Sequence, residues 1–251
     1  MYETIFFLVI IAIIMEIIDS SLGMMFGTIL SPILIGIGYE PLIVVPAILV
    51  SQGFGGLSGT ISHHKFRNAD FNGFTKDTKV ALAMIVPGVF VVFIGVACAI
   101  NIPTIYVKSY IAILVIIMSL LCVSKFKYKF AWWKHYVIGA IASFNKAISG
   151  GGFGPVTSTG GIIGGLKSKI SIATTTFSEL VICFVAFAVY LTYNNELNVL
   201  LICTLSVGAF IGGIIGPIIS SKLNHKSLRK IIGVVGVISG MWLILKLVDI
   251  L

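Results

Sequence analysis

The chain alternates long apolar stretches with short polar connections. Ten apolar segments can be traced, over about residues 4–18, 22–37, 41–62, 79–100, 104–124, 135–148, 153–166, 169–193, 197–220 and 228–249. A helix that crosses the hydrocarbon core of a bilayer needs about 20 residues, and six of these segments reach that length. The pattern predicts an all-α polytopic membrane protein.

The other four segments are short and are interrupted by Gly, Pro or polar residues. They form two pairs, over residues 4–37 and 135–166. Each pair is expected to be either two tilted short spans or one re-entrant hairpin. In both cases the two ends of a pair emerge on the same side of the membrane.

Basic residues gather in alternate connections. If the N-terminus is external, four connections face the cytoplasm, at 63–79, 125–134, 166–169 and 221–230. These four hold 14 of the 17 Lys and Arg residues, and the external connections hold none. Because cytoplasmic loops carry an excess of Lys and Arg, the charges predict a multi-pass protein of the cell membrane with both termini external.

Composition excludes an ordinary soluble domain. Hydrophobic residues make up 58% of the 251 positions and charged residues 10%, whereas soluble domains are about a quarter charged. The net charge of +8 lies mostly in short connections, and no long basic stretch indicates a nucleic-acid partner. The four cysteines stand inside apolar runs without CxxC spacing, so neither a disulfide framework nor a metal site is predicted.

A shift of 127 positions superposes the two broken pairs. It brings together Gly23 and Gly150, Gly27 and Gly154, Gly38 and Gly165, Ser51 and Ser178, Gln52 and Glu179, and Asp19 and Lys146. Each half then consists of a broken pair and three long helices, and an odd number of segments per half turns the second half upside down. The predicted organisation is a first repeat over 1–124, a cytoplasmic linker over 125–134 and a second repeat over 135–251. Inverted repeats with interrupted helices are typical of secondary transporters, whose sites lie near the bilayer midplane.

Glycines and polar residues occupy both breaks, within Asp19–Pro32 and Ser143–Thr159. A helix that begins inside the membrane presents free N–H groups and a positive dipole end, which favour an anion, and Lys146 adds a full charge. The predicted substrate-binding residues are Asp19, Ser20, Gly23, Thr28, Gln52, Asn145, Lys146, Ser149, Gly150, Gly151, Gly152 and Ser178. The alternative is that the glycines only allow helices to pack closely.

Glu179 is a carboxyl group inside a long apolar helix. An ionisable group at membrane depth is a functional hypothesis by default. Two interpretations are equally open: Glu179 carries a coupling proton during transport, or it forms a structural ion pair with Lys146.

At the two glycine motifs the sequence resembles the sulfite exporter TauE/SafE family. The resemblance runs over nearly the whole chain and includes the stretches IIDSSLGMMFGT, ILVSQ, HHKFRNADF, SGGGFGP and TFSEL. It implies a permease rather than an enzyme, without a cofactor. The implied substrates are small anions such as sulfite, thiosulfate, sulfonates or related organic anions, which some members export and others import.

The resemblance can be followed residue by residue. The positions that match the family's motifs are Asp19, Gly23, Gly27, Gly150, Gly151, Gly152, Gly154, Pro155 and Glu179. Two features depart from it. Met24 and Met25 stand where relatives often have small residues, and Gln52 stands where a carboxylate is common.

Two other classes remain open from sequence. An anion channel would use the same broken helices without alternating access. An intramembrane serine protease is suggested by the GxSG sequence at Gly56–Gly59, but Ser58 would need a histidine at matching depth, and all four histidines stand at helix ends or in connections. The expected partners are a small anion, the lipid bilayer, protons or another coupling ion, and a second copy of the chain if it forms a homodimer.

Overall fold

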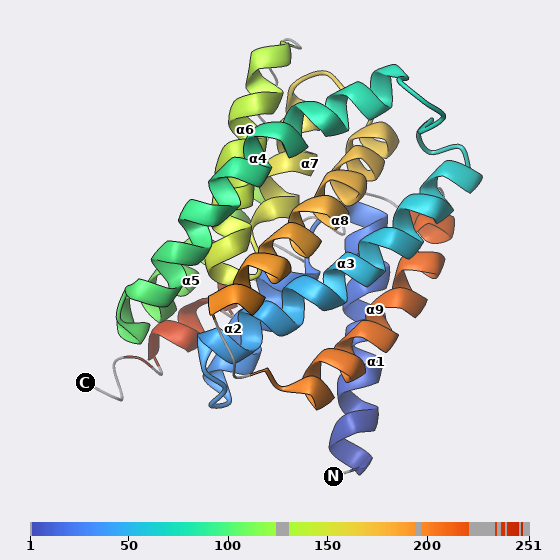
Figure 1. The fold of residues 1–251 in the computed structure, drawn as a ribbon. Helices are drawn as coiled ribbons and strands as arrows, with labels where there is room; N and C mark the ends of the chain where they lie inside the picture. The colour runs from blue at the N-terminus through green and yellow to red at the C-terminus, as the bar shows by residue number, and fades with distance from the viewer. Residues whose placement is uncertain are drawn as a thin grey trace.

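The computed structural model describes residues 2–123, 131–193 and 197–220, together with positions 234, 237, 238, 240–245 and 247. Every regular element in these ranges is an α-helix, as Figure 1 shows. The helices are α1 (Tyr2–Leu22), α2 (Phe26–Gly36), α3 (Pro41–Lys65), α4 (Lys76–Asn101), α5 (Thr104–Val123), α6 (Trp132–Ser149), α7 (Phe153–Ile163), α8 (Ser168–Tyr193) and α9 (Val199–Ser220). The prediction of an all-α protein is confirmed.

These helices follow nine of the ten predicted segments. The tenth segment, 228–249, is described only at scattered positions, and the connections 194–196 and 221–230 and most of the linker 125–134 lie outside the described residues. The largest difference is at the first break, because α1 continues to Leu22 and α2 begins only at Phe26. Asp19 therefore belongs to the last helical turn before the break.

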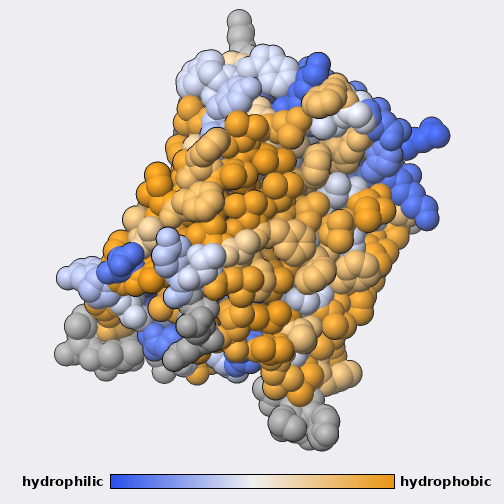
Figure 2. All heavy atoms as spheres, in the orientation of Figure 1, coloured by the Kyte–Doolittle hydropathy of each residue, from blue (hydrophilic) through white to orange (hydrophobic). Residues whose placement is uncertain are grey.

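Five helices are long and apolar enough to cross a membrane. They are Ile5–Leu22, Pro41–Lys65, Lys76–Asn101, Ser168–Tyr193 and Val199–Ser220. Figure 2 shows apolar residues across most of the visible face, with hydrophilic residues concentrated at the upper right and the lower left. Large apolar side chains such as Phe6, Phe90 and Ile94 are more than half exposed, which suits contact with lipid. The chain is a multi-pass membrane protein.

Each broken pair folds back on itself. Ile5 near the start of α1 and Tyr39 after α2 line the same surface hollow, and Gly160 near the end of α7 contacts Ile138 near the start of α6. The two ends of each hairpin therefore lie close together, as the sequence predicts. Helix α9 packs along α1 and α3, and α6 packs along α4.

The tips of the two hairpins meet backbone against backbone. A Cβ atom on Gly27 would lie 1.8 Å from the carbonyl oxygen of Gly150, and one on Gly154 would lie 2.2 Å from that of Gly23. Both distances are far shorter than a carbon–oxygen contact, so a side chain at either position requires the backbones to separate. We call this contact the glycine crossing.

The glycine crossing is reciprocal in sequence. Gly27 contacts Gly150, which lies 127 positions after Gly23, and Gly23 contacts Gly154, which lies 127 positions after Gly27. A two-fold axis between related halves produces such exchanged contacts. The inverted repeat remains a prediction, and this reciprocity supports it.

The glycine crossing makes a prediction about stability. Gly27→Ala is expected to lower the free energy of unfolding by about 1–3 kcal/mol, the usual cost of overpacking, because the new methyl group faces rigid backbone. The measurement is the thermal melting temperature of the purified protein in detergent.

Gly160→Ala in α7 is the matched control. Its Cβ atom would meet Cδ1 of Ile138 at 2.9 Å, and the end of a flexible side chain can move aside. An equal fall in melting temperature for both variants would contradict the close approach at Gly27.

Candidate functional site

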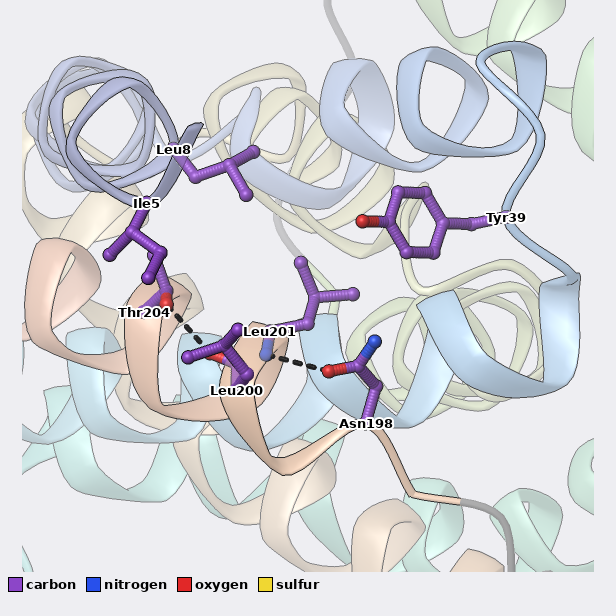
Figure 3. A pocket seen from close by; sticks show the side chains of 7 residues that line it. All are labelled: Ile5, Leu8, Tyr39, Asn198, Leu200, Leu201 and Thr204. Carbon is purple, nitrogen blue, oxygen red and sulfur yellow. Dashed lines mark hydrogen bonds between the residues drawn. The ribbon is translucent and has the colours of Figure 1, made fainter. Parts of the chain in front are cut away.

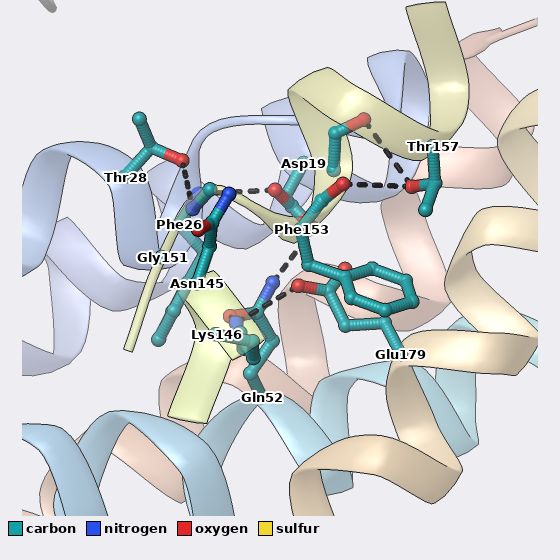
Figure 4. Close-up of polar contacts among 12 residues, drawn as sticks. Asp19, Phe26, Thr28, Gln52, Asn145, Lys146, Gly151, Phe153, Thr157 and Glu179 are labelled. Atoms are coloured by element: carbon teal, nitrogen blue, oxygen red, sulfur yellow. Dashed lines mark hydrogen bonds and ion pairs between the residues drawn. The ribbon is translucent and has the colours of Figure 1, made fainter. Parts of the chain in front are cut away.

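Four polar side chains from four helices meet in the interior of the bundle. Asp19 lies in α1, Gln52 in α3, Lys146 in α6 and Glu179 in α8. None of them is more than 5% exposed, and Figure 4 shows their polar ends turned toward one another. We call this group the central tetrad.

Hydrogen bonds join the central tetrad into one chain. Gln52 Nε2 donates to Asp19 Oδ2 at 3.1 Å. Lys146 Nζ donates to Gln52 Oε1 and, at 2.8 Å, to Glu179 Oε1. The amide of Gln52 thus links a carboxyl group from the first half of the chain to a lysine–glutamate ion pair from the second half.

The helix breaks and one close helix contact position these four groups. Asp19 and Lys146 each stand in the last turn of a helix that ends at a break. Gln52 and Glu179 come from α3 and α8, which approach closely enough that a Cβ atom on Gly56 would lie 3.1 Å from Cβ of Leu180. Small residues at helix interfaces allow such contacts in membranes, and here the contact brings both amide and carboxyl groups within reach of Lys146.

The first helix N-terminus inside the bundle is occupied by a carboxyl group of the protein itself. The backbone N–H of Phe26, the first residue of α2, donates to Asp19 Oδ1 at 3.0 Å. Negative charge is stabilised at this end of a helix. The sequence suggested that this end would face a substrate anion, whereas in this conformation Asp19 takes that position.

The second break is held by hydroxyl groups. Gly152 N donates to Thr28 Oγ1 at 3.1 Å, and Gly151 N donates to Ser149 Oγ at 3.0 Å. Of these two bonds, the one from Gly152 to Thr28 crosses between the breaks and the one from Gly151 to Ser149 lies within the second break. Gly23 and Gly150 supply backbone contacts of the glycine crossing.

Three other predicted site residues lie outside the hydrogen-bonded chain of the tetrad. Asn145 Oδ1 accepts a hydrogen bond from the hydroxyl of Tyr110 at 2.6 Å. Ser178 Oγ donates to the backbone of its own helix, at Thr174 O. Ser20 Oγ donates to Glu16 Oε1 at 2.6 Å. Each of these groups already has a partner within the protein in this conformation.

Sequence reasoning missed two buried ionisable residues near the site. Glu16 in α1 is 1% exposed and His63 near the end of α3 is fully buried. The signal for Glu16 was present, because it is a carboxyl group inside an apolar run, as Glu179 is. His63 stands beside a basic connection, and only the packing of α3 against α1 shows that its ring faces inward.

The interior therefore holds more acidic groups than basic ones. Among the described residues, Glu16, Asp19 and Glu179 are buried carboxyl groups and Lys146 is the one buried amine. Burying an unpaired charge is costly, so buried charges are paired, hydrogen-bonded or neutralised by protons. One lysine does not balance three carboxylates, and the state of the remaining acids depends on hydrogen bonds and protons.

Neither of two hollows on the described surface is lined by the tetrad. One, of 190 Å³, lies between the first turns of α1 and α9, where Tyr39 and Asn198 contribute polar groups, as seen in Figure 3. The other, of 600 Å³, lies beside the connection between α3 and α4 and is lined by Lys65, Arg67 and Asn68 among others. The central tetrad is separated from both.

The candidate protease nucleophile has a structural role. Ser58 Oγ donates to the backbone oxygens of Gly55 at 3.0 Å and Phe210 at 2.8 Å. A nucleophilic serine needs a base as its partner. The bond to Phe210 instead joins α3 to α9.

The comparisons with known proteins agree with the sequence resemblance. The family model described as sulfite exporter TauE/SafE matches residues 8–243. A curated relative, "Probable membrane transporter protein YtnM" of Bacillus subtilis (strain 168), is 28% identical over 237 residues, which cover 89% of this chain and 76% of that protein. No solved structure matches the chain. The described fold and the extent of the family match lead to one conclusion: the chain is a membrane permease that belongs to the sulfite exporter TauE/SafE family.

Proposed function

We propose that this protein is a secondary transporter of small anions, and that the central tetrad and the glycine crossing form its substrate site. The substrates proposed are sulfite, thiosulfate, sulfonates or related organic anions. The observation that carries the proposal is Lys146, a fully buried amine bonded to Glu179 and Gln52 beside a helix break. A buried ammonium requires a negative partner, and an anionic substrate can replace a side-chain carboxylate in that role.

Glu179 is the proposed coupling group. When its carboxylate takes up a proton, the ion pair with Lys146 is lost and the ammonium becomes available to an anion. When the anion leaves, Glu179 releases the proton and pairs with Lys146 again. One anion and one proton then move together, and no bond other than that to the proton is made or broken.

The repeat supports a moving site. Lys146 lies 127 positions after Asp19, and Glu179 lies 127 positions after Gln52, so the tetrad combines two related pairs. In the proposed cycle the two halves rock about the glycine crossing and open the tetrad alternately to the two sides. The closed conformation seen here, with both hollows separated from the tetrad, fits an intermediate of that cycle.

The orientation proposed has the connection between α3 and α4 in the cytoplasm. This connection and the helix ends beside it carry Lys65, Arg67, Lys76 and Lys79, whereas the turn between α4 and α5 has no Lys or Arg. The distribution follows the positive-inside rule.

Removing the buried ion pair tests the substrate site. Lys146→Ala alone leaves Glu179 unpaired, which is expected to cost about 3–5 kcal/mol of stability. The double variant Lys146→Ala/Glu179→Gln removes both charges and is expected to fold. Its flux in proteoliposomes should fall to that of protein-free liposomes for every anion in a panel of sulfite, thiosulfate, sulfoacetate, pyruvate and chloride that the wild type carries.

Lys108→Ala is the control, because Lys108 Nζ pairs with Glu40 at 3.3 Å outside the tetrad. Wild-type flux in the double variant would overturn the site. Saturable exchange by the wild type supports a transporter, and rapid unsaturable flux would identify a channel instead.

Glu179→Gln tests the coupling. With one proton per anion, a pH gradient concentrates the anion about tenfold per pH unit. The variant keeps a hydrogen-bond acceptor for Lys146 but cannot exchange a proton, and a bound anion must then supply the negative partner of the ammonium. It should therefore still exchange anion for anion, with the accumulation ratio reduced to about one. Accumulation equal to that of the wild type would show that another group carries the proton.

Cysteine labelling tests the orientation. Asn101 at the end of α4 and Asn72 in the α3–α4 connection are both exposed. The variants Asn101→Cys and Asn72→Cys are made in a protein without the native cysteines. A membrane-impermeant maleimide should label position 101 in intact cells and position 72 only after permeabilisation. The opposite pattern would reverse the orientation.

A further inference from the structure

Glu16 is a buried carboxyl group that the proposed cycle does not use. Its side chain lies between α1, α3 and α9 and is 1% exposed. Oε1 accepts a hydrogen bond from Ser20 Oγ at 2.6 Å, and Oε2 has no hydrogen-bond partner among the described residues. A buried oxygen atom without a hydrogen-bond partner is costly for an ionised carboxylate and much less costly for a neutral carboxylic acid.

The surroundings of Glu16 are built to hold a carboxyl group. A Cβ atom on Gly55 would lie 2.6 Å from Cδ of Glu16, and one on Gly212 would lie 2.7 Å from its Cβ atom. Glycines on both facing helices thus leave room for this side chain. The residue 127 positions later is Ser143, so the related place in the second half is filled by a much smaller group.

The bonding partners of Glu16 differ from those of the other two buried carboxyl groups. Glu179 is paired with Lys146, and Asp19 accepts hydrogen bonds from Phe26 N and Gln52 Nε2. Both environments stabilise a carboxylate. Glu16 has neither an amine partner nor a second donor among the described contacts.

No described cation is bonded to Glu16, because Lys146 on α6 donates to Gln52 and Glu179 instead. The other groups near it that can titrate are Asp19 on its own helix, His63 on α3, and Cys183 and Glu179 on α8, and described α9 has none but the exposed Cys203. His63 is neutral in this arrangement, because Nε2 must carry the hydrogen donated to the carbonyl of Ser20 at 2.9 Å while Nδ1 faces the amide nitrogen of Asn68 at 3.1 Å.

These contacts also connect Glu16 to one side of the protein. Asn68 lines the 600 Å³ hollow beside the α3–α4 connection. From it, hydrogen bonds pass to His63, then to the carbonyl of Ser20, and the hydroxyl of Ser20 contacts Glu16. The series of polar contacts that begins at the hollow ends at the carboxyl group of Glu16.

We propose that Glu16 is an internal proton-binding site, occupied in this conformation and facing the hollow beside the α3–α4 connection through Ser20, His63 and Asn68. The chemistry is a single equilibrium, in which the neutral acid releases one proton and becomes a carboxylate. The proton-binding site itself does not depend on the proposed function. Only the use of the proton in the transport cycle rests on it. Glu16 stores a proton while Glu179 is ionised against Lys146.

Infrared difference spectroscopy of the purified protein in lipid nanodiscs tests the site without any substrate. Spectra recorded between acidic and alkaline buffer should contain a carbonyl-stretch band from a protonated carboxylic acid that is lost in Glu16→Gln. Glutamine has nearly the same shape and still accepts a hydrogen bond from Ser20, so the fold should be kept. Glu40→Gln, at a half-exposed surface carboxylate, is the matched control and should leave this band in place.

Ser20→Ala gives a second readout that does not depend on the glutamine variant. It removes the hydrogen bond to Oε1 and should shift the same band to higher frequency without abolishing it. A band that is unchanged in both Glu16→Gln and Ser20→Ala would overturn the proposal. Absence of anion flux in the wild type would overturn the proposed function and leave the infrared result standing.

Discussion

The structure depends on the contact of two helix breaks through bare backbone. At the glycine crossing, a carbonyl of each break occupies the space where a side chain of the other would stand. This contact fixes where α1 and α6 end, and therefore where Asp19 and Lys146 point. The hydroxyls of Thr28 and Ser149 bond to the free N–H groups there, so the bundle tolerates two interrupted helices in its interior without leaving those groups bare.

The second constraint is the cost of charge in an apolar interior. Lys146 is fully buried and is stabilised by Glu179 and Gln52 from two other helices. Glu179 can also be neutralised by a proton, and the amide nitrogen of Gln52 keeps its bond to Asp19 whether or not Lys146 bonds to the amide oxygen. In the proposed cycle this ion pair is exchanged for a proton and an anion, and the excess of buried acids over bases is the reason for proposing Glu16 as the place of a stored proton.

Much of the site could be read from single residues, but its connections could not. Lys146, Glu179, Gln52 and Asp19 were identifiable because polar groups inside apolar runs are expensive, and a pairing of Lys146 with Glu179 was one of two open interpretations. The role of Gln52 as the bridge from Lys146 to Asp19 depends on how α3 lies relative to α1 and α6. Ser178, on the same helix as Glu179, bonds instead to backbone carbonyls of its own helix and of α4. Periodicity places a residue on a helix but does not say which face meets a partner.

The sequence by itself determined the class of the protein, the helices and the family. Long apolar runs have one stable form in a bilayer, because an α-helix satisfies all backbone groups within one segment, and nine of ten expected helices are described. Only the tertiary structure decided that Asp19 lies within α1, that its carboxylate takes the N-terminus of α2, and that Glu16 and His63 face inward. These outcomes depend on distances between segments that are far apart in the chain. The glycines that set those distances look the same in sequence whether they allow helices to pack or form a binding site.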